Sequence, residues 1–437
     1  MANSFSKEER VAFEDLLAGF QDALVLSKNV SIYRTDGTMM ERARDTIWRP
    51  MPYIATSINS TPGSSIASSY ADFTQLAVPA TLGFSKTVPW TMTTLELRDA
   101  LQENRLGDAA RQKLASDINV AMLNVASTQG TLVVPISAAA GTYDDVAACD
   151  SIMNEQGVPM EDRALALSSR DYNGLAGNLA GGNVSGLFGN GRSFSGDKSN
   201  RAYERSYVGM VANFDTFKMD YSLRCAANAV TPTIATNGAQ VRYVPQATST
   251  AVGGQINVDN RYQVVTISSV SGIVPGDMFE IAGIEAVHHI TKQSTGQLKT
   301  FRVIDTPTSD PSLGAAQIRI SPPMIGANST PTDAELQYKN INVASTSATA
   351  AINFLNTAAT SINPFWHKSA MELLPGRYAV PSDAGAAIMR ASTDQGIELV
   401  MQKFYDIDSM TIKYRLDTLF GVVCTNPEMA GVLVFNQ

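Results

Sequence analysis

Two adjacent histidines, His288 and His289, are the residues of this chain that most directly suggest a metal or catalytic site. The chain has 3 histidines in 437 residues, so a neighbouring pair stands out. The segment IEAVHHITK, however, has the composition of a β-strand, in which consecutive side chains point to opposite faces. One ion could not readily bind both rings, and His367 lies far away in sequence. We therefore expect ordinary strand histidines and no metal site.

Two groups of carboxylates could also do chemistry. Asp406 and Asp408 would share one face of a strand, as an acid and base pair requires, but the alternation continues through TIKYRLD and indicates the polar face of a half-buried sheet. Asp144, Asp145 and Asp150 fall in a helical segment, whose positive amino end favours acidic residues without any metal. No GxSxG or HExxH motif accompanies these carboxylates. The sequence therefore predicts no catalytic residues.

A glycine-rich segment and three cysteines complete the candidates. Residues 174–196 contain GLFGNG, which fits neither GxGxxG nor GxxxxGK[ST], so we expect a flexible surface loop and no nucleotide cofactor. Cys149, Cys225 and Cys424 are odd in number and widely spaced, which excludes a disulfide framework or a zinc ribbon and favours a reducing cytoplasm.

Composition limits the partners of the chain. With 33 Lys and Arg against 41 Asp and Glu, the formal net charge is −8, which disfavours tight binding of nucleic acid by a single copy. The amino terminus is too charged and amphipathic for a signal peptide, and no run approaches the ~18 apolar residues of a membrane span. At 44% hydrophobic residues, the chain is expected to build two or three cores.

The first third of the chain predicts helices and one long hairpin. Ser6 and Glu9 form a capping box before an apolar stripe, which fits either a core helix or an arm that docks on a partner. Residues 45–84 predict two extended arms with a soft tip at 56–71. A long helix is expected over 93–130 with a bend or break at Gly107, and a shorter one over 143–156.

The rest of the chain predicts a β domain inserted into an α+β body. From 227 to 343 the helical period is replaced by short alternating runs separated by Gly, Pro, Asp and Ser, as in a small antiparallel barrel. Residues 344–358 are expected to return to a helix, and the last 35 or so residues to form two strands around the turn TNPE.

Eight strings in this order resemble the major coat protein of short-tailed bacteriophages of the Lederbergvirus type. They are DTIWRP at 45–50, SSRDYNGLAG at 168–177, AYERSYVGMVANFD at 202–215, NVDNRYQVVTIS at 257–268, GDMFEIAGI at 276–284, NINVASTSATAAINFLN at 340–356, NPFW at 363–366 and GVVCTNPEMAGV at 421–432. The resemblance implies the tailed-phage capsid fold of the Hong Kong 97 type, α+β in class, with an inserted antiparallel β-barrel domain.

The resemblance also implies a division of the chain. It assigns an N-terminal arm at 1–45, an extended hairpin loop at 46–90, a spine helix and peripheral domain at 91–135, the first part of the axial domain at 136–226, the inserted domain at 227–343, and the rest of the axial and peripheral domains at 344–437. Residues 244–256, where the family's long insert loop would lie, carry no charge, so salt bridges between capsomers are not expected there.

The function that the resemblance implies is structural. Copies of the chain would form hexamers and pentamers of an icosahedral shell with a scaffolding protein and a portal, in the host cytoplasm, and touch packaged double-stranded DNA weakly. The implied contacts between subunits are Trp48, Ile54, Ser64, Ser65, Phe73, Leu187, Phe188, Val252 and Gln255. Two other functions fit the residues alone: a glycan- or partner-binding module that uses the β insert, and a cytoplasmic hydrolase without a visible motif.

Overall fold

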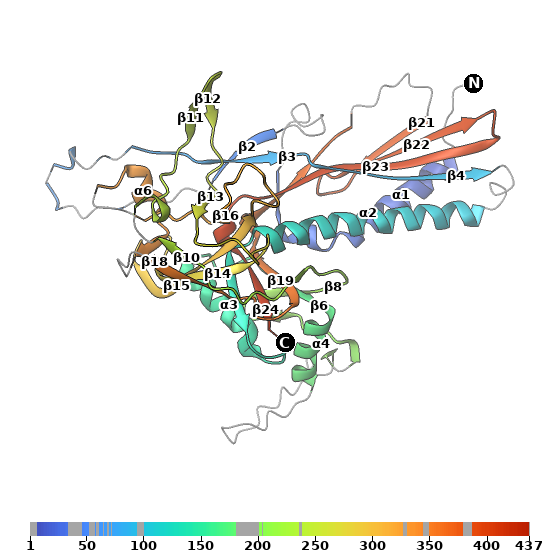
Figure 1. The fold of residues 1–437 in the computed structure, drawn as a ribbon. Helices are drawn as coiled ribbons and strands as arrows, with labels where there is room; N and C mark the ends of the chain where they lie inside the picture. Colours follow the sequence, from blue (N-terminus) through green and yellow to red (C-terminus); the bar gives the residue numbers. More distant parts are fainter. Residues whose placement is uncertain are drawn as a thin grey trace. The chain divides into compact units, whose positions relative to one another are not determined.

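The structure is a computed structural model, and it describes residues 7–33, 46–51, 57, 61–63, 65–67, 70, 72–93, 100–180, 201–202, 204–235, 238–326, 330–343, 349–378 and 387–436. The chain divides into two compact units. The first contains Met1–Trp48, Pro79–Val125 and Met371–Val423, and the second contains Arg49–Val78, Ala126–Ala370 and Cys424–Gln437. Figure 1 shows the elements of both.

The first unit combines a sheet with helices. The sheet has the order β1-β20-β23-β22-β21, and β4 also pairs with β23. Its strands are β1 Ser31–Ile32, β4 Phe84–Thr93, β20 Met371–Pro375, β21 Ala387–Ser392, β22 Glu398–Asp406 and β23 Thr411–Cys424. The helices are α1 Lys7–Ala23, the 3-10 turn η1 Leu26–Asn29, and most of α2 Ala100–Gln129.

Both helices of this unit test expectations from the sequence. The apolar stripe of α1 is buried at Phe13, Leu16 and Phe20, so this helix has one covered apolar face. The capping box at Ser6 lies outside the described residues. The long helix is confirmed, but the break at Gly107 is wrong, because α2 continues through that residue. A single glycine costs a helix only about 1 kcal/mol, which the helical residues around it can offset.

A seven-stranded sheet, called the central sheet below, organises the second unit. Its order is β5-β24-β19-β6-β8-β7, with β9 also paired to β19. The strands are β5 Leu132–Ile136, β6 Arg163–Ser168, β7 Met210–Val211, β8 Phe214–Met219, β9 Arg224–Cys225, β19 Thr360–His367 and β24 Ala430–Phe435. The short turns η5 Lys368–Ala370 and η6 Pro427–Met429 follow β19 and precede β24.

Two helices share a core with the central sheet. They are α3 Tyr143–Gln156 and α4 Ser169–Ala180. The core includes Val146, Met153, Leu165, Phe214 and Phe365. The bounds of α3 are as predicted, and Gly157 ends the helix in the left-handed conformation that favours glycine. The loop expected from residue 174 onward is wrong up to 180, where α4 continues, and residues 181–200 lie outside the described part.

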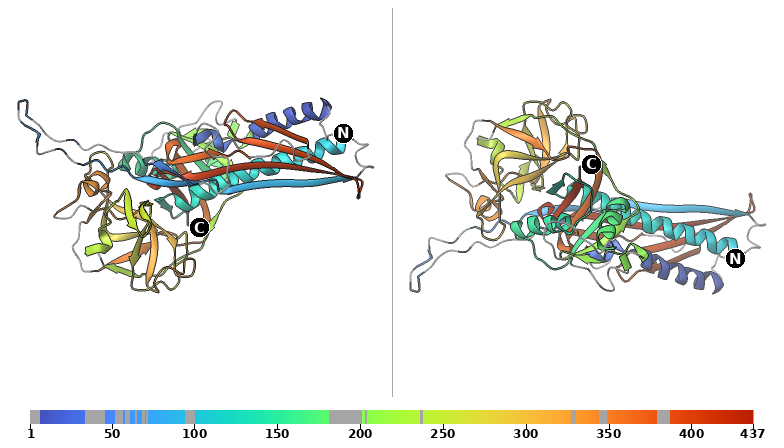
Figure 2. Two further views of the ribbon diagram at one scale, coloured as in Figure 1. Left: turned by 90° about the horizontal axis from the view of Figure 1, so that it is seen from above. Right: turned by 90° about the horizontal axis from the view of Figure 1, so that it is seen from below.

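A second sheet of this unit lies within residues 228–356, a segment called the inserted domain below. Its order is β10-β18-β14-β15-β16-β13, with β17 also paired to β14. A bridge from Ile234 to Ile267 links the two ends of this order, so the sheet closes on itself (Figure 2). Its elements are β10 Thr233–Ala235, η4 Gly238–Val241, β13 Gln263–Thr266, β14 Met278–Val287, β15 Ser294–Asp305, β16 Gln317–Ser321, α6 Asp333–Tyr338, β17 Ile341–Val343 and β18 Thr349–Phe354. The predicted barrel is confirmed.

One expectation about this sheet is wrong. The helix predicted over 344–358 is absent from the described residues 349–358, where β18 pairs with β10 and β14 instead. Buried and exposed residues alternate strictly along TAAINF, as in a strand with one covered face. The run of alanines suggested a helix because alanine has the highest helix propensity, but tertiary packing against Ile281 and Phe279 decides the outcome.

The two arms of the predicted hairpin are present. Strands β2 Thr46–Pro50 and β3 Ala77–Thr81 form a two-stranded sheet, and residues 51–76 between them are called the extended loop below. Half of its predicted soft tip, residues 56–71, lies outside the described residues. The predicted carboxy-terminal strands are also confirmed, with Tyr414 and Leu416 buried and Lys413 and Arg415 exposed. None of the described helices is both long and apolar enough to span a membrane.

Candidate interface regions and the junction behind them

A hairpin of the inserted domain is a strongly exposed candidate contact region. Strands β11 Thr248–Ala251 and β12 Gly254–Asn257 pair only with each other, and Figure 1 shows them projecting from the barrel. Val252 at the turn and Gln255 on β12 are both exposed. Neither strand has a buried residue, so the hairpin gains no stability from a core of its own. Such a projection is free to contact another molecule.

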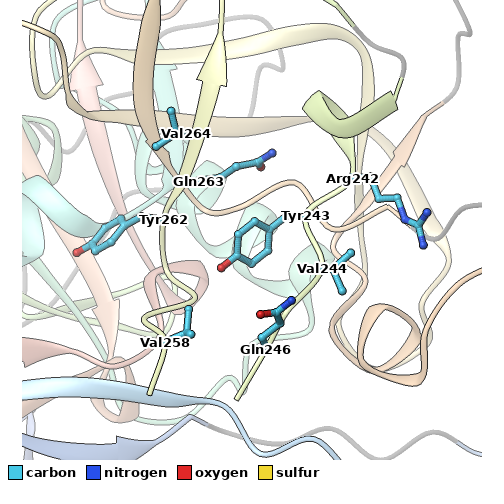
Figure 3. Close-up of a pocket in the computed structure, with 8 residues that line it drawn as sticks. All are labelled: Arg242, Tyr243, Val244, Gln246, Val258, Tyr262, Gln263 and Val264. Carbon is cyan, nitrogen blue, oxygen red and sulfur yellow. The ribbon is translucent and has the colours of Figure 1, made fainter. Parts of the chain in front are cut away.

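A pocket of about 460 Å³ lies at the root of this hairpin (Figure 3). The chain segments that enter and leave the hairpin form its walls, and the facing rings of Tyr243 and Tyr262 are the largest groups in it. The side chain of Asn260 joins the two segments by hydrogen bonds. Its Oδ1 accepts from the Tyr243 hydroxyl and from the main-chain N–H of Gln246, and its Nδ2 donates to the main-chain carbonyl of Gln246. These contacts fix the direction in which the hairpin leaves the barrel.

The extended loop carries further candidate residues. Phe73 is 56% exposed and Ser65 is exposed, whereas Trp48 on β2 is half-buried. Ile54 and Ser64 lie outside the described residues, and so do Leu187 and Phe188. Phe73 and Ser65 belong to the extended loop, whereas Val252 and Gln255 belong to the β11–β12 hairpin. They are separate candidate surfaces.

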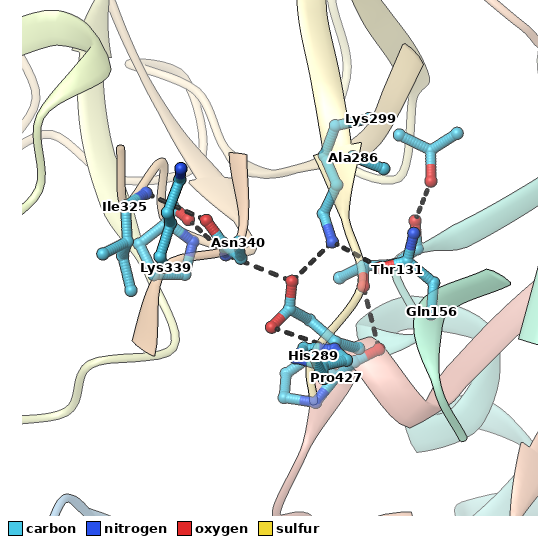
Figure 4. A network of polar contacts seen from close by, with 12 residues as sticks. Thr131, Gln156, Ala286, His289, Lys299, Ile325, Lys339, Asn340 and Pro427 are labelled. Atoms are coloured by element: carbon cyan, nitrogen blue, oxygen red, sulfur yellow. Dashed lines mark hydrogen bonds and ion pairs between the residues drawn. The ribbon is translucent and has the colours of Figure 1, made fainter. Parts of the chain in front are cut away.

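The inserted domain meets the central sheet through buried polar groups as well as apolar ones. Met278 of β14 packs among Val133, Val432 and Val434 of the central sheet. Beside this apolar contact, Lys299 of β15 donates to Glu428 of η6 over 2.5 Å and to the Gln156 side chain over 3.1 Å (Figure 4). Lys299 is 1% exposed, so the ion pair lies in the interior. A buried charge of this kind depends on its partner to remain charged.

Electrostatics at this contact favour the charged carboxylate. Burial is the largest single influence and would raise the pKa of Glu428, but Lys299, His289 and the hydrogen bond from Asn340 together outweigh it, and the pKa falls to about 2. Asn340 adds a hydrogen bond of 3.1 Å from its Nδ2 to Glu428. Figure 4 shows Lys299 and Asn340, both of the inserted domain, directed at the same carboxylate, which is that of Glu428.

A second buried cation, Arg302, lies at the carboxyl end of the long helix α2. Arg302 of β15 donates from Nη1 to the carbonyls of Ser127 and Gly130, at the carboxyl end of α2, and from Nη2 to Gly276. The last turn of α2 has no basic residue of its own. Since a helix exposes unpaired carbonyls and negative charge at that end, a guanidinium placed there satisfies both. The inserted domain therefore caps α2.

The two connections of the inserted domain lie side by side. The Asn228 N–H donates to the Asn356 carbonyl over 2.9 Å. Asp277, which is 1% exposed, accepts from the side chains of Asn228 over 2.7 Å and Asn356 over 2.9 Å. One buried carboxylate thus joins the chain entering the domain to the chain leaving it.

The histidine pair is not on one strand, which corrects the sequence expectation. β14 ends at Val287, and His288 and His289 follow in a turn. His288 Nδ1 accepts from the N–H groups of Ile290 and Thr291, whereas His289 is buried at 3.6 Å from Glu428. No cluster of three or more His, Cys, Asp or Glu side chains in the described residues could hold a metal ion.

The other candidate groups take structural contacts. Asp406 ends β22 and pairs with Lys413 over 2.9 Å, while Asp408 lies in the following turn, so the expectation that the two share a strand face is wrong. Asp145 forms a capping box with Thr142, and Asp150 pairs with Arg163. The three cysteines are free and buried, and burial raises the pKa of Cys424 to about 12.

Acid is expected to weaken this unit through His289. Burial lowers the pKa of His289 to about 4, against the opposing effect of Glu428. Between pH 6.5 and about 4 the unfolded chain binds a proton that the folded chain does not, so stability falls as the pH falls through this window, by at most about 3 kcal/mol. Urea unfolding of wild type and His289→Gln across this range should show a steeper loss in wild type. Parallel curves would contradict the assignment.

Comparison with known proteins identifies the chain. A family model described as the P22 coat protein, gene protein 5, matches residues 1–436. The solved CUS-3 coat protein I-domain is 30% identical, and the match covers 30% of this chain and 99% of that one, with a TM-score of 0.21. Mycobacterium phage Che8 matches at 10% identity over 94% of this chain and 90% of that one, with a TM-score of 0.42. The capsid of Cyanophage P-SCSP1u matches at 10% identity over 93% and 86%, with a TM-score of 0.43. Since one family model spans nearly all of the chain, the chain belongs to the P22 coat protein family and is a major capsid protein of a tailed phage.

Proposed function

We propose that this capsid protein assembles with a scaffolding protein and a portal into an icosahedral procapsid of hexamers and pentamers, which expands as double-stranded DNA is packaged. Assembly takes place in the cytoplasm of the host. The observation that carries the proposal is the match of one coat-protein family to residues 1–436. The membership gives the chain a structural role in a shell of many copies.

The net charge supports the proposed relation to DNA. At a formal charge of −8, the subunit repels a polyanion unless its basic residues are gathered on one face. Weak, non-specific contact suits a capsid whose DNA must slide during packaging. Each phosphate neutralised by a Lys or Arg of the capsid adds to the affinity for DNA and slows its movement.

We propose that contacts between subunits use the separate surfaces already described. The β11–β12 hairpin would use Val252 and Gln255, and the extended loop would use Phe73 and Ser65. Trp48, Ile54, Ser64, Leu187 and Phe188 complete the proposed set. The domain division given above is also proposed, with the inserted domain continued to residue 356, since β18 belongs to its sheet.

Loss of the hairpin should stop assembly without unfolding the subunit. Residues 249–256 can be replaced by two glycines because Thr248 and Asn257 are paired neighbours. Since neither strand has a buried residue, we expect the thermal midpoint of the monomer to stay nearly unchanged. Sedimentation with the scaffolding protein should show shells for wild type and none for the deletion.

Point variants separate the hairpin from general surface effects. Val252→Ser should reduce shell yield, and Val274→Ser, at another exposed valine of the inserted domain, should not. A large fall in the monomer's thermal midpoint on deletion would mean that the hairpin packs on its own domain. Normal shells from the deletion would refute the proposed contact, and a wild-type chain that stays monomeric with its scaffold would refute the proposed function.

A further inference from the structure

The short helix α6 holds the root of the extended loop through one side-chain amide. Gln337 Nε2 donates to the Asp72 carbonyl over 2.7 Å, and Gln337 Oε1 accepts from the Thr74 N–H over 3.4 Å. The amide thus binds the carbonyl before residue 73 and the N–H after it, as a neighbouring β-strand would. Gln337 is 3% exposed, so the amide is a buried group with its polar atoms directed at the loop.

Two neighbours of Gln337 extend the contact. The Tyr338 hydroxyl donates to the Thr74 carbonyl over 2.9 Å, and Asp333 Oδ2 accepts from the Asp72 N–H over 2.8 Å. On the loop side, all of these hydrogen bonds use main-chain groups of Asp72 and Thr74. The helix therefore binds the extended shape of this segment and not its side chains.

The helix that makes these contacts is itself firmly placed. Glu335 is fully buried and pairs with Arg242 through two hydrogen bonds of 2.6 and 3.0 Å. Thr332 and Glu335 form a capping box at the start of α6. The ion pair with Arg242 thus attaches this helix of six residues to the barrel and the capping box stabilises its first turn, so the binding groups on it are preorganised.

Further contacts of the described residues also hold the root of the extended loop. The Met51 N–H donates to the Leu76 carbonyl over 2.8 Å, and Ala77 pairs with Asp259 of the inserted domain. Farther out, Tyr70 is 81% exposed. The root of the loop is therefore held at residues 72–77, by these main-chain contacts together with the buried side chain of Leu76, which is 2% exposed.

We propose that α6 is an intramolecular peptide-binding site occupied by residues 72–74 of the same chain, and that it sets the direction in which the extended loop leaves the subunit before a neighbour is met. This rests on the proposed function, because direction matters only for a loop that must reach another subunit. Gln337 is the main positioning residue, and Asp333 and Tyr338 support it.

Amide hydrogen exchange of the monomer tests the binding site without any assembly. Gln337→Met removes both amide contacts, and we expect exchange at the Thr74 N–H to become roughly ten-fold faster. Asp333→Ala should have a similar effect at the Asp72 N–H. Leu336→Ala is the matched control, since Leu336 is on the same helix but is 43% exposed and makes no hydrogen bond to the loop. Equal exchange in Gln337→Met, Asp333→Ala and the control would overturn the binding site.

A milder variant guards against loss of the fold. Tyr338→Phe removes only the hydroxyl and keeps the ring, so it should loosen residues 72–76 while denaturant unfolding of the domain stays unchanged. If the Gln337→Met variant does not fold, the Tyr338→Phe variant decides whether α6 binds the loop. Unchanged amide hydrogen exchange at residues 72–76 in Tyr338→Phe would then contradict the proposal.

Shell assembly tests the second part of the proposal, that α6 sets the direction of the extended loop. Variants with faster exchange should give open or misshapen shells with the scaffolding protein, whereas Leu336→Ala should give normal ones. Normal shells despite faster exchange would mean that α6 binds the loop without setting its direction, which contradicts the proposal. If even wild type fails to form shells, the proposed function fails, while the exchange experiment still decides the binding site.

Discussion

Replacing Arg302 with leucine is expected to lower the free energy of unfolding by about 3 kcal/mol, because three carbonyls lose a charged donor and the end of α2 loses its cap. Arg302 is 0% exposed, and burial lowers its pKa to about 10, so it remains charged at neutral pH. Denaturant unfolding of the monomer measures the loss. Hydrogen exchange should localise it to the last turn of α2.

Two other variants separate charge and geometry at this position. Arg302→Lys keeps the charge but cannot reach carbonyls on two sides, so an intermediate loss is expected. Arg319→Leu is the control, because Arg319 lies on the adjacent strand β16, is partly exposed and pairs with Asp305 and Asp310. Its loss should stay below about 1 kcal/mol. Equal losses at Arg302 and Arg319 would contradict the capping role.

The second large effect is expected at the ion pair between Lys299 and Glu428. Lys299→Met leaves a buried carboxylate without its cation, which costs about 3–5 kcal/mol, and Glu428→Gln leaves a buried ammonium with a comparable cost. The double variant should recover much of the loss, because replacing both charges removes the need to compensate either. A double-mutant cycle by denaturant unfolding measures this coupling, and strictly additive losses would exclude it.

These losses matter for a shell protein because domains are only marginally stable, by about 5–15 kcal/mol. A subunit that loses a third of this fails to fold at moderately raised temperature, and no shell forms. Since Lys299 and Arg302 lie on one strand of the inserted domain, that domain stabilises both the central sheet and the end of α2.

Patterns with one clear period could be predicted from the sequence. The bounds of α3 follow from acidic residues at its start and Gly157 at its end, and the strand containing Tyr414 and Leu416 follows from strict alternation. The barrel also follows, because its strands alternate and Gly, Pro and Asp separate them. In each case local composition and tertiary packing favour the same structure.

The junction could not be predicted, for a physical reason. In KTFRVID, Thr300 and Arg302 alternate with Phe301 and Val303, which is the pattern of a strand with one face in water. The polar face is covered instead by the end of α2 and the central sheet, whose residues come from distant parts of the sequence. Alternation shows that a strand has two faces but does not show what covers the second.

The helix expected at 344–358 and the break at Gly107 were wrong for related reasons. Alanine favours a helix in isolation, yet β18 gains more by pairing with β10 and β14 on the barrel. Gly107 disfavours a helix in isolation, yet it lies within a helix of 30 residues. The propensities of single residues were overridden in both places, by sheet pairing at β18 and by the surrounding helical residues at Gly107.

Cryo-electron microscopy of particles formed with the scaffolding protein tests the central claim most directly. That claim is that the chain is a shell subunit whose inserted domain is held on its own body by Lys299 and Arg302 and offers its hairpin to a neighbour. The expected reconstruction is a closed icosahedral shell in which both contacts are intact within each subunit and the β11–β12 hairpin meets another copy. A wild-type chain that forms no closed particles, or a shell in which the hairpin meets no other copy, would contradict the account.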